Sequence, residues 1–107
     1  LTRDVLEEAG YRVLSAPDGQ AGLAALQEQG EAIDLVVLDW LGLPLTTPET
    51  FRRMRTQRGD LKVLLVGSAR WKKAMLELVG SGAVTYLQKP YDPAVLCRQV
   101  EEAITGR

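Results

Sequence analysis

The chain has 107 residues and 46% of them are hydrophobic, which is enough for one compact domain with a core and too little for two. Its 13 basic and 14 acidic residues leave a net charge of −1, so no overall charge draws it to nucleic acid or to an anionic membrane. The sequence has no histidine and a single cysteine, Cys97, which excludes histidine general bases, Ser-His-Asp catalysis, most zinc sites and an internal disulfide.

No part of the sequence predicts a membrane span or an export signal. No apolar run approaches the roughly 20 residues that a membrane span needs, and the first residues are charged and helical in pattern, unlike a signal peptide. We therefore expect a single cytoplasmic domain over residues 1–107 that binds neither nucleic acid nor membrane directly.

Short apolar runs rich in branched side chains alternate with amphipathic stretches, the pattern of a parallel sheet with helical crossovers. The first half predicts a helix that ends at Gly10, a strand over Tyr11–Ala16, a helix over Gly19–Gln29 capped by Asp18, and a strand over Ile33–Asp39. The second half predicts a helix from Thr47-Pro48 to about Arg58, a strand over Leu61–Val66, a helix over about Arg70–Val79, a strand over Val84–Gln88, and a last helix that Asp92-Pro93 begins. This order describes a doubly wound α/β domain without its first strand.

Asp39 and Lys89 stand at the carboxyl ends of two predicted strands. Ligands of open parallel sheets bind at this edge. Two interpretations fit these residues. Either Asp39 is a nucleophile that accepts a phosphoryl group while Lys89 pairs with the phosphate oxygens, or the two side chains form a structural ion pair.

Four stretches, in order, carry a resemblance to a known family: Glu7–Val13, Ala16–Gly19, Asp34–Asp39, and Gly82-Ala83 together with Tyr86–Asp92. Over essentially its whole length the chain resembles the receiver domain of two-component response regulators. The resemblance implies a flavodoxin-like sheet of strand order 2-1-3-4-5 with helices on both faces, strand 1 being missing from this chain. It also implies that Asp39 takes a phosphoryl group from the phosphohistidine of a histidine kinase or phosphotransfer protein, the role of a signalling domain rather than of an enzyme.

The resemblance assigns further roles by position. Lys89 contacts the phosphate, Tyr86 is the switch aromatic, the peptide bond before Pro90 is cis, and Mg²⁺ is held by Asp39 and the backbone carbonyl of Leu41. The other Mg²⁺ ligands of the family are an acidic pair after the first strand, so we expect the metal only if such a pair exists upstream. For Tyr86 the alternative is an ordinary core aromatic.

Several positions depart from the family pattern. The Ser or Thr that ends the fourth family strand is replaced by Gly67, and Ser68 stands one residue late, so it serves only if the loop is shifted. Pro44 is also one place late, and Trp40 adds bulk beside Asp39, either as packing or as a gate. These departures keep a rival function open: a degenerate pseudo-receiver that acts as an interaction or dimerisation module without phosphorylation.

Two surfaces are candidates for partner binding. Receiver domains commonly dimerise or dock through the face that matches residues 70–79, 84–88 and 93–104, so a homodimer through this face is one expectation. A basic cluster is either a solvated face or a contact for an acidic partner; it comprises Arg52, Arg53, Arg55, Arg58, Lys62, Arg70, Lys72 and Lys73.

The missing strand has an energetic consequence. In the family it lies between the strands that match Tyr11–Ala16 and Ile33–Asp39. Unpaired buried backbone groups there would each cost about 1–3 kcal/mol, against a domain stability of about 5–15 kcal/mol. We therefore expect the natural polypeptide to begin roughly ten to twenty residues upstream, enough for a strand. The alternatives are direct pairing of the flanking strands or a strand from another copy.

Overall fold

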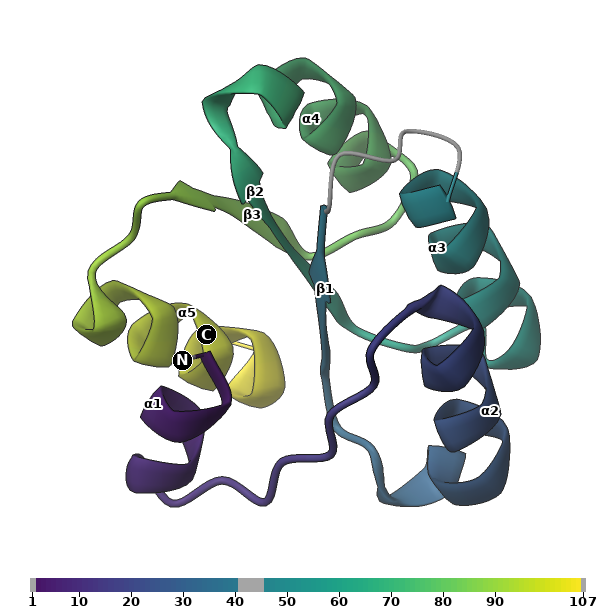
Figure 1. Cartoon of the computed structure of the whole chain (residues 1–107). Helices are drawn as coiled ribbons and strands as arrows, with labels where there is room; N and C mark the ends of the chain where they lie inside the picture. The colour runs from purple at the N-terminus through teal and green to yellow at the C-terminus, as the bar shows by residue number, and fades with distance from the viewer. Residues whose placement is uncertain (1, 41–45, 107) are drawn as a thin grey trace.

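The computed structural model describes residues 2–40 and 46–106. Its centre is a parallel sheet of three strands, in the order β1 (Val36–Asp39), β2 (Val63–Ser68) and β3 (Thr85–Lys89). In the register of the sheet, Asp39 is the partner of Val66 and Lys89 is the partner of Ser68. All three strands therefore end at the same edge of the sheet (Figure 1). Asp39 and Lys89 are the last residues of β1 and β3, so both stand at this edge.

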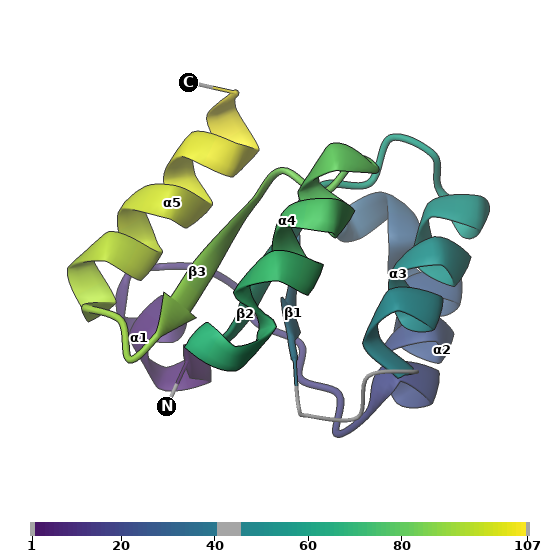
Figure 2. The same ribbon diagram turned by 90° about the horizontal axis from the view of Figure 1, so that it is seen from above.

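Helices cover both faces of the sheet. On one face lie α1 (Thr2–Glu8) and α5 (Pro93–Thr105), and on the other lie α2 (Gly19–Gln29), α3 (Thr46–Gln57) and α4 (Lys72–Gly80) (Figures 1 and 2). Short 3-10 turns, Gly30–Ala32 (η1) and Ala69–Trp71 (η2), follow α2 and precede α4. None of the helices in the described part of the chain has the length and apolar content of a membrane span.

Local signals in the sequence set the ends of these helices. The Asp18 carboxylate accepts a hydrogen bond from the backbone N–H of Ala21 and caps α2, and Asp92 caps α5 in the same way through Ala94. Pro93 occupies the first turn of α5, and Gly106 ends this helix in a left-handed conformation with φ of 76°. Both capped starts were predicted correctly from the sequence.

The central strand, β2, is the most buried element. Val63, Leu64, Leu65 and Val66 are at most 2% exposed, because helices pack against both faces. Leu65 belongs to a core cluster under α2, α3 and α4, whereas Leu64 belongs to a second cluster under α1 and α5. The sheet thus separates two hydrophobic cores. A continuous apolar run such as that of β2 is typical of a strand that is covered on both faces.

The strand predicted over Tyr11–Ala16 is wrong: within residues 2–40 and 46–106 this segment forms no strand and pairs with none. Tyr11 and Val13 still pack against the α1–α5 core. Two apolar side chains of the segment are therefore partly buried, but a strand also needs a hydrogen-bonded neighbour. The other strands form with shifted bounds: β1 begins at Val36 after η1, and β2 extends two residues beyond the predicted end, to Ser68.

Candidate functional site

Asp39 and Lys89 form an ion pair across the carboxyl edge of the sheet. The Lys89 ammonium donates a hydrogen bond to Asp39 Oδ2 at 2.9 Å, although the residues are 50 positions apart in sequence. The two side chains are 41% and 42% exposed, so a reagent can reach them. A pair this exposed contributes at most about 1 kcal/mol to stability, so the fold does not depend on it.

The second carboxylate oxygen of Asp39 is in a different environment. Oδ1 is buried and has no hydrogen-bond partner in the part of the chain that the structure describes. Buried polar atoms are nearly always paired, because an unpaired one loses its bonds to water without compensation. Asp39 therefore has one oxygen occupied by Lys89 and one that is ready to accept a donor or a cation.

The residues at the end of β2 divide between the two faces of the sheet. Because side chains alternate along a strand, the register places Ser68 on the same face as Asp39 and Lys89. Gly67 faces the opposite side, where β2 packs under α4. The displaced hydroxyl of Ser68 is therefore on the charged side of the strand, and the position that the family gives to Ser or Thr is on the apolar side.

The space beside Gly67 is filled. A Cβ atom on this residue would lie 3.0 Å from the Cβ of Trp40 and 3.1 Å from the sulfur of Met75. Trp40 is only 5% exposed and stacks on Trp71, with ring centroids 5.6 Å apart and an interplanar angle of 20°. The bulky residue after Asp39 is thus packed into the core. Trp71 was missed as a site residue, since no local pattern signals its contact with Trp40.

The remaining predicted site residues have separate positions. Tyr86 is half-buried and packs against the core under α2, α3 and α4. The Lys89-Pro90 peptide bond is cis, as the resemblance implies. Leu41 and Pro44 lie outside the described residues.

The residues that the structure describes do not fit a magnesium ion by themselves. Within them, no group of three or more His, Cys, Asp or Glu side chains is arranged to hold a metal. Mg²⁺ demands near-octahedral oxygen coordination, and Asp39 provides one carboxylate whose Oδ2 already binds Lys89.

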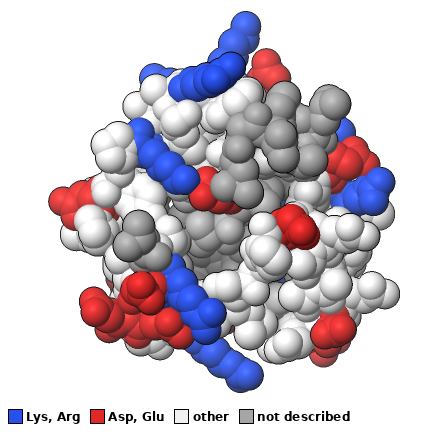
Figure 3. Space-filling model, in the orientation of Figure 1, with Lys and Arg blue, Asp and Glu red and all other residues white. Residues whose placement is uncertain are grey.

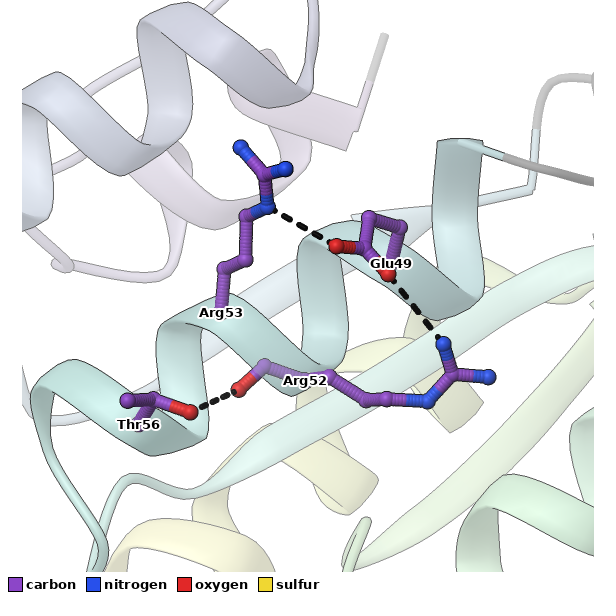
Figure 4. Close-up of polar contacts among 4 residues, drawn as sticks. All are labelled: Glu49, Arg52, Arg53 and Thr56. Carbon is purple, nitrogen blue, oxygen red and sulfur yellow. Dashed lines mark hydrogen bonds and ion pairs between the residues drawn. The ribbon is translucent and has the colours of Figure 1, made fainter.

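The basic residues of α3 are largely tied to neighbours. Glu49 accepts hydrogen bonds from Arg53 at 2.9 Å and from Arg52 at 3.2 Å (Figure 4). The Arg53 hydrogen bond and the charges of both arginines lower the pKa of this carboxyl group. Arg55 donates to the backbone carbonyl of Gly82. On the face in Figure 3, acidic and basic side chains are interspersed, which favours the interpretation as a solvated surface.

These observations first define a class: an α/β domain whose parallel sheet carries a paired carboxylate and ammonium at its carboxyl edge. The family model for the response regulator receiver domain matches residues 1–101, so the chain belongs to this family of two-component signalling domains and has the flavodoxin-like fold. Members of the family are signalling domains rather than conventional enzymes.

Individual relatives support this assignment. The chain is 31% identical to the transcriptional regulatory protein FixJ of Bradyrhizobium diazoefficiens over 94% of its own length and 48% of FixJ, and 31% identical to the response regulator RppA of Synechocystis over 88% of its length and 40% of RppA. It therefore spans less than half of either relative. The receiver domain of NtrX from Brucella abortus has the same fold, with a TM-score of 0.89 at 23% identity, over 99% of this chain and 88% of that domain.

Proposed function

We propose that this domain accepts a phosphoryl group on Asp39 from the phosphohistidine of a histidine kinase or phosphotransfer protein in the cytoplasm. The observation that carries the proposal is the 2.9 Å contact between the Lys89 ammonium and the Asp39 carboxylate at the open edge of the sheet. Family membership supports it, because phosphorylation on an aspartate is the general function of receiver domains.

The residues have distinct tasks in the proposed transfer. A carboxylate oxygen of Asp39 forms a bond to phosphorus, the bond between phosphorus and the histidine nitrogen breaks, and the imidazole leaves with the electron pair. Lys89 then has the phosphoryl oxygens within its reach and balances the charge that moves onto them. Ser68, on the same face, is the candidate hydroxyl donor, and Tyr86 is the candidate switch residue. Mg²⁺ would join only with acidic ligands from beyond the described residues.

A small phosphodonor tests this proposal without a cognate kinase. The full polypeptide that carries this domain is incubated with acetyl phosphate or phosphoramidate, with and without Mg²⁺, and its intact mass is measured. We expect one phosphoryl group on the wild-type protein and none on Asp39→Asn, which keeps the shape of the side chain and removes the nucleophile. An unlabelled wild-type protein, or an equally labelled variant, contradicts phosphorylation of Asp39.

A second function has one specific observation in its favour. Gly67 stands where the family has a hydroxyl side chain, and Trp40 and Met75 pack tightly against it, which suits a pseudo-receiver that binds a partner without phosphorylation. Leu76 and Val84, which are 48% and 42% exposed, lie on the face formed by residues 70–79, 84–88 and 93–104. For this function we expect a homodimer through that face, detected by light scattering and weakened by Leu76→Asp. Dimerisation without any labelling of Asp39 would favour it.

A further inference from the structure

The packing around Gly67 bears on how a change at Asp39 reaches the rest of the domain. Any side chain at this position would have to displace the Cβ of Trp40, which is fixed close to the backbone, or the sulfur of Met75 in α4. A hydroxyl side chain at Gly67 therefore fits only if Trp40 or Met75 shifts by a few tenths of an ångström. The space is already occupied by an aromatic side chain.

Trp40 is directly linked to Asp39 and to the neighbouring strand. It follows Asp39 in the chain, and its backbone N–H donates a hydrogen bond of 2.7 Å to the carbonyl of Val66. Its ring nitrogen, Nε1, is buried and has no hydrogen-bond partner in residues 2–40 and 46–106. A small shift that gave Nε1 an acceptor or water would remove the cost of this unpaired donor. The ring is thus held by packing alone. A second position of the ring, in which Nε1 is hydrogen-bonded, can compete with this one.

The stacked partner, Trp71, connects this ring to α4. Trp71 ends η2 and is the residue immediately before α4, so its ring packs at the point where that helix begins. The guanidinium of Arg70 lies 5.3 Å from the centre of the Trp71 ring, close enough for a cation–π contact. Arg70, Trp71, Trp40 and Asp39 therefore form a continuous path of contacts and covalent bonds from the surface to the carboxylate.

We propose that the stack of Trp40 on Trp71 couples a change at Asp39 to the connection between β2 and α4 (residues 68–72), in place of the hydroxyl side chain that is absent at Gly67. The natural trigger in this inference is the phosphorylation of Asp39 and so rests on the proposed function. The coupling itself is a property of the packing, and any change in the charge of Asp39 that breaks its pair with Lys89 should act through it.

Hydrogen exchange of the backbone amides in residues 68–75, followed by mass spectrometry, tests the coupling on the full polypeptide. Asp39→Asn is introduced into the wild-type protein, into Trp71→Leu, which removes the stack, and into Trp71→Phe, which keeps an aromatic ring. We expect Asp39→Asn to change exchange in residues 68–75 by about fivefold or more in the wild-type and Trp71→Phe backgrounds. In Trp71→Leu we expect no change. Peptides from residues 100–105 of α5, which pack in the other core cluster, serve as the control region and should respond in no variant.

The outcomes separate this inference from the proposed function. If residues 68–75 do not respond to Asp39→Asn, or respond equally in Trp71→Leu, the coupling is overturned. If a phosphodonor labels Asp39 and exchange in residues 68–75 stays the same, the coupling is overturned while phosphorylation stands. If Asp39 is not labelled, the proposed function fails, and the comparison of the Asn variants still decides the coupling. The emission of the two tryptophans, the only two in the chain, provides a second readout of the same pair.

Discussion

Two neighbourhoods meet at the carboxyl edge of the sheet. On one side of it, Asp39 and Lys89 form an open charged pair, each side chain about two fifths exposed. On the other side, Gly67 and Trp40 are buried against Met75 beneath α4. The charged side keeps the carboxylate and the ammonium of the family pattern, and on the buried side Gly67 replaces the Ser or Thr of that pattern.

The difference teaches that reaction and response can change independently. A phosphoacceptor needs a nucleophile and a cation at short range, and both are set by the ends of β1 and β3. A response needs an element with two arrangements, and here the candidate is aromatic packing rather than a hydroxyl group. Substitutions on each side should therefore affect different measurements.

Replacing the cation on the charged side should have the largest effect. In Lys89→Met we expect labelling of Asp39 by a phosphodonor to be about 100-fold slower, the usual loss when one group that stabilises developing charge is removed. Stability should change by less than about 1 kcal/mol, because the pair is half-exposed. The measurement is the rate of phosphoryl mass gain, with urea unfolding alongside.

Lys73→Met is the matched control for this experiment, because it removes an exposed lysine near the start of α4. Its labelling rate should equal that of the wild-type protein. Equal rates for Lys89→Met and Lys73→Met would show that Lys89 has no part in the transfer.

Filling the space beside Gly67 on the buried side should lower the stability of the domain. In Gly67→Thr the new Cβ would be 3.0 Å from Trp40 and 3.1 Å from Met75, so we expect a loss of about 1–3 kcal/mol in the free energy of unfolding, as for other overpacked cores. Urea unfolding measures this loss directly.

Gly80→Ala provides the comparison, since a Cβ on Gly80 meets no atom within 4 Å and the residue is helical. We expect that variant to be as stable as the wild-type protein or more stable by about 0.4–1 kcal/mol. A Gly67→Thr protein that unfolds at the wild-type urea concentration would mean that the space beside Gly67 can open, and that a hydroxyl is not excluded.

The charged side could be predicted from the sequence, and the buried side could not. Asp39 ends an apolar run and Lys89 ends another, and parallel strands always bring such ends to one edge. Counting residues from Asp39 and Lys89 also located Gly67. Trp40 follows β1 and Trp71 follows β2, so the two stacked residues are 31 positions apart in the sequence (71 minus 40). No periodic pattern in the sequence predicts a contact of this kind.

The wrong strand over Tyr11–Ala16 has a similar cause. Its side-chain pattern is local and predicted a strand, whereas Tyr11 and Val13 are partly buried against the core under α1 and α5 without forming one. Pairing is not local, because it depends on whether another strand lies alongside. Local patterns therefore predicted helix starts such as Asp18 and Asp92 better than they predicted the number of strands in the sheet.

The smallest effect is expected for an ion pair that lies on a single helix and not at the ends of two strands. Glu49 contacts Arg53 at 2.9 Å, the same distance as between Asp39 and Lys89, but both partners lie on α3 and are one turn apart. Glu49→Gln should lower the melting temperature slightly at pH 7, by less than Gly67→Thr does, and should leave phosphodonor labelling unchanged. The two pairs together test whether a short ion pair is sufficient for labelling, or whether the strand-end position is required.

The lowered pKa of Glu49 determines how the effect of Glu49→Gln on the melting temperature changes with pH. Because the arginines lower the pKa of Glu49 in the folded protein, its contribution to stability is fully present above the ordinary carboxyl pKa and is lost as the pH falls through the lowered value. The difference in melting temperature between wild type and Glu49→Gln should therefore shrink in acid and also in high salt, which screens exposed charges. A difference that persists in acid would show that Glu49 stabilises α3 by something other than its charge.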